Sequence, residues 1–216
     1  MEILVPEYCF QVKCSSKDKP GCGSSANGIL VDRKHGWFIV NEHFISAGEE
    51  HIVVLPSTGR KHRLVVHKGL INKEADIALM SIEDPTVLPV VQLPNYGPPP
   101  TVRQQSLTIA GHQLSGQSCV EVELLRYPTN AWSVSNLRGD GYQQFIRCFV
   151  HGDIKTAGLS GSPYLDARGK LVGIHVLGKP SHTLSVPSFE IANLLKKARR
   201  PTVRALLRRI GQAIWN

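Results

Sequence analysis

A proline-rich segment near the middle of the chain does most to limit the folds that it can adopt. Residues 93–100, with the sequence Leu-Pro-Asn-Tyr-Gly-Pro-Pro-Pro, contain four prolines. Proline lacks a backbone donor and does not occupy the centre of a sheet. On both sides of this segment, short apolar runs alternate with turn-forming residues, which is typical of β-strands. The pattern therefore predicts two groups of about six strands joined by a connector.

The expected strands are short and closely spaced. The first group covers residues 8–12, 28–31, 36–40, 52–55, 61–67 and 76–82, and the second covers residues 106–110, 118–125, 145–151, 162–165 and 170–176. Two helices are expected after the strands, at residues 188–199 and 201–215. Because 42% of the 216 residues are hydrophobic, the chain can bury a sizeable core. We therefore expect a folded, mostly β protein and exclude a helical bundle.

The charge distribution indicates a basic C-terminal segment on a nearly neutral body. The net charge is +8, but residues 196–216 hold seven cations and no acidic residue. The charge is therefore weak support for a nucleic-acid-binding fold. No run approaches the roughly 18 apolar residues that span a membrane, and the first residues do not resemble a signal peptide. We expect a cytoplasmic protein.

The cysteines are an odd number, which disfavours a disulfide framework. They are Cys9, Cys14, Cys22, Cys119 and Cys148. A zinc site at the first three is the alternative, but no C-x-x-C pair or close group of cysteine and histidine accompanies them. We expect free thiols and no metal or organic cofactor.

The most informative motif is Gly-Leu-Ser-Gly-Ser-Pro at residues 158–163. Gly158 allows a sharp turn, so the amides of Gly158 and Ser160 can point to one spot beside the Ser160 hydroxyl. Two such donors would form an oxyanion hole, which stabilises the negative oxygen of an acyl-transfer intermediate. The alternative is an ordinary Gly/Ser turn between two strands.

A serine nucleophile needs a base to take its proton and an acid to orient that base. His43 follows an apolar run directly, and Asp76 precedes another, so each would lie at the mouth of a strand. His35 and His51 are the competing bases, although neither directly follows an apolar strand. Glu74 is the reserve acid.

The order His43, Asp76, Ser160, with the segments Asp-Ile-Ala-Leu at 76–79 and Gly-Leu-Ser-Gly-Ser-Pro, resembles the chymotrypsin-like serine peptidases. The similarity covers roughly residues 8–190. Residues 158–178, including Gly-Lys-Leu-Val-Gly-Ile-His-Val at 169–176, are similar to the 3C-like main proteases of positive-strand RNA viruses. The serine-nucleophile members, as in arteriviruses, astroviruses and sobemoviruses, are the nearest kind.

The resemblance implies an all-β fold of two six-stranded antiparallel barrels with C-terminal helices. Its divisions would be an N-terminal barrel at 1–92, the proline-rich connector at 93–103, a C-terminal barrel at 104–187 and a basic helical segment at 188–216. The catalytic triad would lie between the barrels. Ser160 would be the nucleophile, His43 the base and Asp76 the orienting acid, with Gly158 and Ser160 forming the oxyanion hole.

The resemblance also implies how a substrate would bind. Residues 174–178, with Ile174 and Val176, would pair with the substrate backbone as an added strand. His175 would lie in the pocket for the residue before the scissile bond and bind Gln or Glu. Lys155 and Thr156 would lie nearby, and a cation there would favour Glu. The alternative is that His175 is a core histidine and Lys155 a solvated loop residue.

These inferences predict a serine endopeptidase that processes a viral polyprotein after Glu or Gln, in the host cell cytoplasm. The alternatives are a cellular intracellular trypsin-like or HtrA-like peptidase, and a catalytically silent relative that binds peptide or RNA. The partner of the enzyme would be a polypeptide substrate.

The basic segment has a second pattern, because residues 201–215 place apolar side chains at helical spacing with arginines off that stripe. The apolar residues are Val203, Leu206, Leu207, Ile210 and Ile214. This helix could pack on the second barrel, bind RNA or an anionic membrane, or belong to a neighbouring polyprotein segment.

Overall fold

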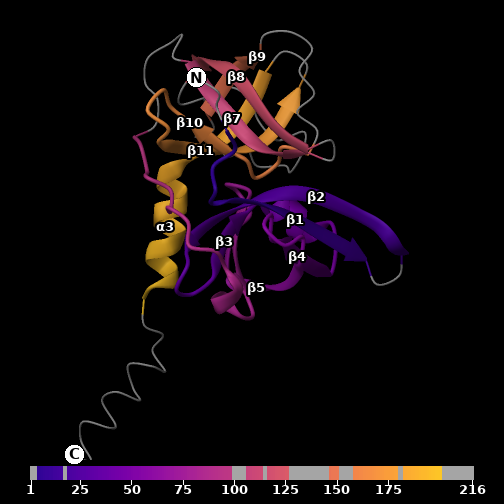
Figure 1. Cartoon of the computed structure of the whole chain (residues 1–216). Helices are drawn as coiled ribbons and strands as arrows, with labels where there is room; N and C mark the ends of the chain where they lie inside the picture. Colours follow the sequence, from indigo (N-terminus) through magenta and orange to yellow (C-terminus); the bar gives the residue numbers. More distant parts are fainter. Residues whose placement is uncertain are drawn as a thin grey trace, which may run out of the picture.

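The computed structural model describes residues 4–16, 19–98, 106–113, 116–126, 146–150, 158–179 and 182–200. Within them, the strands form two antiparallel barrels, drawn one above the other in Figure 1. The first barrel is the lower one in this view, and the second barrel is the upper one. Helix α3 begins beneath β11 of the second barrel and runs alongside the first. The prediction of an all-β fold of two six-stranded barrels is confirmed.

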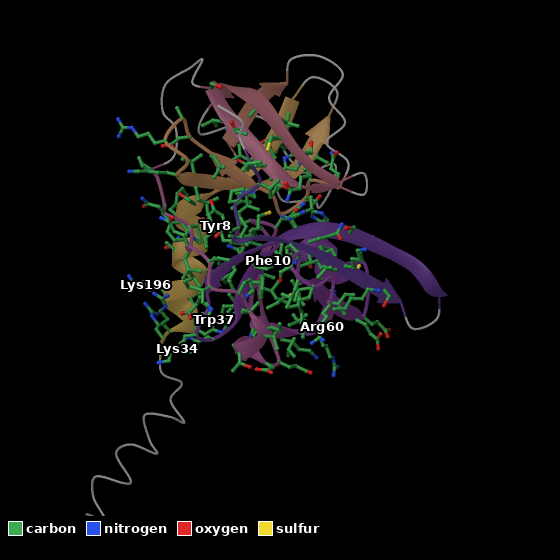
Figure 2. The ribbon with its side chains drawn as sticks, viewed as in Figure 1. Tyr8, Phe10, Lys34, Trp37, Arg60 and Lys196 are labelled. Carbon is green, nitrogen blue, oxygen red and sulfur yellow. The ribbon has the colours of Figure 1, made fainter. Side chains whose placement is uncertain are left out.

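The first barrel is closed, with strand order β1-β2-β3-β6-β5-β4. Its elements are β1 (Cys9–Ser16), β2 (Lys19–Asp32), β3 (Trp37–Val40), α1 (Glu42–Ser46), β4 (Glu50–Val54), β5 (Lys61–Asn72) and β6 (Ile77–Ile82). Pairing of β1 with β4 closes the barrel. Phe10 and Phe38 meet edge to face inside it, with ring centroids 5.5 Å apart, and Figure 2 labels Phe10 there. This edge-to-face geometry is favourable between aromatic rings.

The second barrel is also closed, with strand order β10-β11-β12-β9-β8-β7. A short 3₁₀ helix η1 (Pro85–Val87) precedes the connector, and the barrel consists of β7 (Ser106–Gln113), β8 (Gly116–Arg126), β9 (Ile146–Val150), β10 (Pro163–Leu165), β11 (Leu171–Lys179) and β12 (His182–Pro187). Tyr96 in the connector forms a bridge with Leu171. The connector therefore contacts β11 as it passes between the barrels.

Helix α3 (Ser188–Ala198) follows the last strand of the second barrel and returns to the first. Its buried side chains Ile191, Leu194 and Leu195 belong to a hydrophobic cluster that combines the core of the first barrel with residues of β11 and β12. Arg199, just after the helix, pairs with Asp32 of β2 at 3.4 Å. The helix therefore covers apolar surface of a barrel to which it is not adjacent in sequence. In the described ranges, no helix is both long and apolar enough to cross a membrane.

The structure differs from the sequence prediction at several strand ends and adds two elements. Strand β2 begins at Lys19 instead of residue 28, because glycine and serine residues that indicated a loop continue the ladder with β1. Helix α1 and strand β12 were not predicted. Strand β6 begins at Ile77, one residue later than expected. The helix predicted at 188–199 is confirmed as α3, whereas the helix predicted at 201–215 lies outside the described residues.

Candidate active site

His43 and Asp76 form a close pair within the first barrel. The His43 ring nitrogen Nδ1 lies 2.6 Å from Asp76 Oδ2, and the His43 backbone amide donates to Asp76 Oδ1 at 2.8 Å. The Asp76 side chain is only 8% exposed, whereas that of His43 is 38% exposed. Because a carboxylate oxygen accepts, Nδ1 carries the proton and Nε2 keeps a lone pair. His43 is therefore oriented as a base.

The backbone around Asp76 is fixed by the segment that precedes His43. Asp76 has a φ of 54°, in the left-handed region that few non-glycine residues adopt. Its carbonyl oxygen accepts from the Asn41 side chain at 3.2 Å and from the Glu42 amide at 3.1 Å. Both carboxylate oxygens and the carbonyl oxygen of Asp76 therefore accept hydrogen bonds. Because these bonds come from Asn41, Glu42 and His43, the start of α1 holds the strained conformation.

Ser160 lies in a tight turn of the second barrel, between Gly158 with φ 87° and Gly161 with φ 81°. The intervening Leu159 side chain is buried in the core of this barrel. The Ser162 amide donates to the Leu159 carbonyl at 2.9 Å, which closes the turn. The two glycines allow backbone angles that L-residues avoid, as the motif predicted.

The turn is joined to both barrels. The Asn27 amide of β2 donates to the Ser160 carbonyl at 2.7 Å, and the Gly161 amide donates to the His175 carbonyl at 2.9 Å. The structure therefore seats the predicted nucleophile at the junction of the barrels. A Cβ atom on Gly161 would lie 1.9 Å from the Asn27 carbonyl oxygen, which shows how closely the barrels approach here.

The competing residues occupy other places. His35 is on the surface and pairs with Asp32 at 3.0 Å. His51 is buried on β4, where its ring packs against Phe44 and burial lowers its pKa. Glu74 is exposed. Of the three candidate bases, His43 is the one that contacts Asp76, so the geometry favours the expected pair.

His175 is buried on β11, beside a tyrosine and a threonine that the sequence analysis missed. The Tyr164 hydroxyl lies 3.4 Å from His175 Nδ1, the two rings are stacked, and the same hydroxyl hydrogen-bonds to Thr183 Oγ1. Burial, with a smaller contribution from the charge of His43, lowers the pKa of His175 to about 3. The ring is therefore neutral near pH 7. No motif in the sequence indicated Tyr164 or Thr183.

Strand β11 offers a backbone edge close to Ser160. Ile174 and Val176 are buried. Between them, the His175 amide donates to the Ser162 carbonyl at 2.8 Å and the His175 carbonyl accepts from the Gly161 amide at 2.9 Å, so β11 is bonded to the Ser160 turn. Strand β10 pairs with β11 only as far as Ile174, and β12 pairs with it on the other side as far as Lys179. Among the described strands, none pairs with the first edge beyond Ile174. Lys155 and Thr156 lie outside the described residues.

This arrangement of barrels and side chains defines a class of protein, the chymotrypsin-like serine peptidases. The comparison with known protein families identifies the particular family. The model of the trypsin-like peptidase domain matches residues 26–174, and the chain belongs to this family. The matched residues include His43, Asp76 and Ser160. No curated protein matches the chain.

Solved structures support the same fold at low sequence identity. The chain is similar to the HtrA-type protease AlgW with a tripeptide, with a TM-score of 0.69 and 16% identity, over 89% of this chain and 60% of that one. It is also similar to the active form of the Rv3671c protease from M. tuberculosis, with a TM-score of 0.73 and 13% identity, over 92% of this chain and 83% of that one. The chain thus spans less than two thirds of the AlgW chain.

Proposed function

We propose that this chain is an active serine endopeptidase with the triad His43, Asp76 and Ser160. The observation that supports it most is the 2.6 Å contact between His43 Nδ1 and Asp76 Oδ2. The backbone bond from Asn27 of the first barrel to Ser160 of the second adds support, because it holds the Ser160 turn against the barrel that carries this pair. A surface histidine without a catalytic role needs no nearly buried carboxylate whose two oxygens both accept hydrogen bonds. A base that becomes an imidazolium during the reaction needs such a carboxylate to stabilise its charge.

The chemistry follows from these positions. Ser160 Oγ attacks the peptide carbonyl carbon while His43 Nε2 takes the hydroxyl proton, giving a tetrahedral intermediate with a negative oxygen. The amides of Gly158 and Ser160 stabilise that oxygen. His43 then returns the proton to the leaving amine, and the acyl-serine is hydrolysed by a water that His43 activates in the same way. Asp76 keeps the imidazole tautomer and stabilises its charge.

We propose that His175 selects Gln or Glu before the scissile bond. The Tyr164 hydroxyl can donate to Nδ1 of the neutral ring, which leaves the Nε2 proton for the side-chain oxygen of the substrate. A site that donates to a buried oxygen discriminates strongly against residues without one. Because the His175 ring is neutral, it does not favour a negatively charged Glu over Gln. Any preference for Glu has to come from a cation elsewhere in the pocket, and Lys155 is the candidate.

The natural substrate separates two versions of this proposal. Polyprotein processing by a viral enzyme is supported by the resemblance of residues 158–178 to the 3C-like proteases. An HtrA-like cellular peptidase is favoured by the structural similarity to AlgW. In both versions we propose a cytoplasmic enzyme that cleaves polypeptides. The residue preferred before the scissile bond distinguishes them.

We also propose an anionic partner, RNA or membrane, for the basic C-terminal segment. Lys196, Lys197 and Arg200 are exposed where α3 ends, and Figure 2 shows Lys34 close to Lys196 at this end of the helix. Truncation after Arg200 should weaken salt-sensitive binding to RNA or to anionic vesicles and leave peptide cleavage intact. A lower melting temperature with unchanged binding would instead indicate that the segment packs on the protein.

The activity is tested with a fluorophosphonate probe, which reacts with activated serines. Native protein should be labelled at Ser160, and Ser160→Ala should not be labelled. The matched control Ser162→Ala removes a neighbouring hydroxyl on the same turn and should keep the labelling site. Absence of labelling in the folded wild-type protein would support the catalytically silent alternative.

The specificity is tested with a peptide library varied before the scissile bond. We expect Gln or Glu there, and His175→Ala should reduce cleavage of both about 10- to 100-fold. His35→Ala, a change of the same residue type on the surface, should leave the preference intact. Preference for Arg, Lys or a small aliphatic residue would contradict the viral version and favour a trypsin-like or HtrA-like enzyme.

A further inference from the structure

The side chain of Asn27 is fully buried and contacts the Ser160 turn of the other barrel. Its Nδ2 donates to the carbonyl oxygens of Gly158 at 3.0 Å and His112 at 3.1 Å, and lies 3.4 Å from that of Ser160. Its Oδ1 accepts from the His112 amide at 2.7 Å. These contacts are separate from the backbone bond between Asn27 and Ser160, which any residue at this position could make.

The orientation of this amide is dictated by its partners. The carbonyl oxygens of Gly158, Ser160 and His112 can only accept, and the His112 amide can only donate. Reversing the Asn27 amide would place oxygen against three acceptors and nitrogen against a donor. The structure therefore requires a group at residue 27 that donates on one side and accepts on the other, which asparagine provides.

The contacts fix the direction of successive carbonyls in the turn. Asn27 holds the carbonyls of Gly158 and Ser160, and the Ser162 amide holds that of Leu159. In a planar peptide the carbonyl and the amide point in opposite directions. The Ser162 amide, by holding the Leu159 carbonyl, therefore also sets the direction of the Ser160 amide, which is an expected oxyanion donor. Asn27 holds the Gly158 carbonyl and so fixes the turn at Gly158, where φ is 87°.

We propose that Asn27 is a positioning residue that preorganises the oxyanion hole from the opposite barrel. This inference rests on the proposed peptidase function and adds a residue to it. Asn27 touches no reacting atom and acts through Gly158 and Ser160. Oxyanion donors are effective when their direction is set before the reaction, so loosening these carbonyls should reduce stabilisation of the transition state more than binding of the substrate.

The test compares Asn27→Asp and Asn27→Ala with the wild type on a quenched peptide selected by the library. Asparagine and aspartate have the same shape, but an aspartate side chain turns an oxygen toward three carbonyls. We expect kcat to fall about 10- to 100-fold with KM changed less than about threefold, because a lost oxyanion donor itself costs about 10²- to 10³-fold. Leu30 is a buried core residue on β2, the strand that also carries Asn27. Leu30→Ala is the control for destabilisation and should lower the melting temperature with little change in kcat.

A pH series gives a readout that a purely structural role would not produce. A protonated aspartate at residue 27 regains a donor, and burial among carbonyls raises the pKa of such a carboxyl. The kcat ratio of Asn27→Asp to wild type should therefore rise at least about fivefold from pH 8 to pH 5. The titratable neighbours of Asn27 are the Cys9 thiol and the His112 ring, which donates from Nε2 to the Cys9 carbonyl. The double variants Asn27→Asp/Cys9→Ser and Asn27→Asp/His112→Gln, each compared with its own Asn27 parent, should keep the same rise.

The outcomes separate this inference from the proposed function. If the wild type cleaves peptides and Asn27→Asp has the same kcat, or loses kcat only in proportion to a melting-temperature loss matched by Leu30→Ala, the positioning role is wrong and the function stands. If Asn27→Asp instead raises KM with kcat unchanged, the residue acts in substrate binding and the inference is also wrong. A folded wild type that neither cleaves nor reacts with fluorophosphonate overturns the function, and the positioning role with it.

Discussion

The two barrels have the same strand number and contribute to the site in different ways. The first barrel supplies His43 and Asp76, and the contacts that fix them come from its own residues, including Asn41 and Glu42. The second barrel supplies Ser160, whose turn is bonded partly to Asn27 of the first barrel. The acid and base are thus a self-contained unit, whereas the placement of the nucleophile depends on how the barrels dock.

The barrels also differ in their buried histidines. In the first barrel, burial lowers the pKa of His51 and His67. In the second, deeper burial and the nearby His43 lower the pKa of His175 to about 3. Among the described histidines, the largest electrostatic perturbation is therefore at a residue bonded to the Ser160 turn. Perturbed groups of this kind often mark functional sites.

The largest expected effect is loss of turnover when either barrel loses its catalytic group. His43→Ala and Ser160→Ala should each reduce kcat/KM by about 10⁴- to 10⁶-fold, and Asp76→Asn somewhat less. The double variant should be no worse than either single one, because the two groups act in one step. Steady-state kinetics measure this, with His35→Ala as the control. Retention of more than a tenth of the activity in His43→Ala would contradict the assignment of the base.

The docking of the barrels is tested by Gly161→Ala. The new methyl group would meet the Asn27 carbonyl oxygen at 1.9 Å, on a residue with φ 81°. We expect the free energy of unfolding to fall by about 3 kcal/mol or more, since strain and overpacking add. Gly169→Ala, with φ 71° and nothing within 4 Å, should cost only about 1 kcal/mol. Equal losses in urea unfolding would show that the barrels do not constrain Gly161.

The buried histidines predict how stability depends on pH. The pKa of His175 is about 3 in the folded protein against 6.5 for the unfolded chain, so the unfolded state binds more protons between these values. Stability should therefore fall on acidification below pH 6.5, approaching about 1.4 kcal/mol per pH unit from this residue. His175→Gln should remove that slope between pH 6 and pH 4, and His51→Gln should remove a smaller part. Identical slopes in wild type and His175→Gln would contradict the burial of a neutral ring.

The smallest expected effect concerns the thiols. The described free cysteines are Cys9 and Cys14, buried in the first barrel, and Cys119, exposed in the second. Burial raises the pKa of Cys9, which makes it unreactive. Alkylation of native protein should change kcat/KM less than about twofold, and Cys119→Ser should remove the modification at this residue, which peptide mass mapping measures. Activity lost on alkylation in both wild type and Cys119→Ser would point to a thiol other than Cys119.

The parts of the fold that follow from local pattern were predicted, and those that depend on distant contacts were not. The alternation of apolar residues indicated most strands, and the glycines around Ser160 indicated the turn. Strand β12 was missed because His182–Pro187 mixes polar residues with its apolar ones and ends in proline. Thr183 and Ser185 are buried, and the strand pairs with β9 and β11, which only the folded chain brings together.

The same limit applies to the site. The order of His43, Asp76 and Ser160 was visible in the sequence, and the structure pairs the first two. Asn27, Tyr164 and Thr183 belong to no sequence motif. Their hydrogen-bond partners lie elsewhere in the chain, and Ser160 is 133 residues away from Asn27. Their contacts depend on the register and docking of strands. The roles proposed for His43, Asp76, Ser160 and Asn27 are predictions that the experiments above test.

The return of α3 to the first barrel has a consequence for synthesis on the ribosome. Residues 188–198 join a hydrophobic cluster whose other members come from both barrels, whereas the strands of the first barrel end at Ile82. When only the residues up to Ile82 have left the exit tunnel, the first barrel lacks the helix that covers part of its apolar surface. A nascent chain at that stage would carry His43 and Asp76 without Ser160 and without this helix.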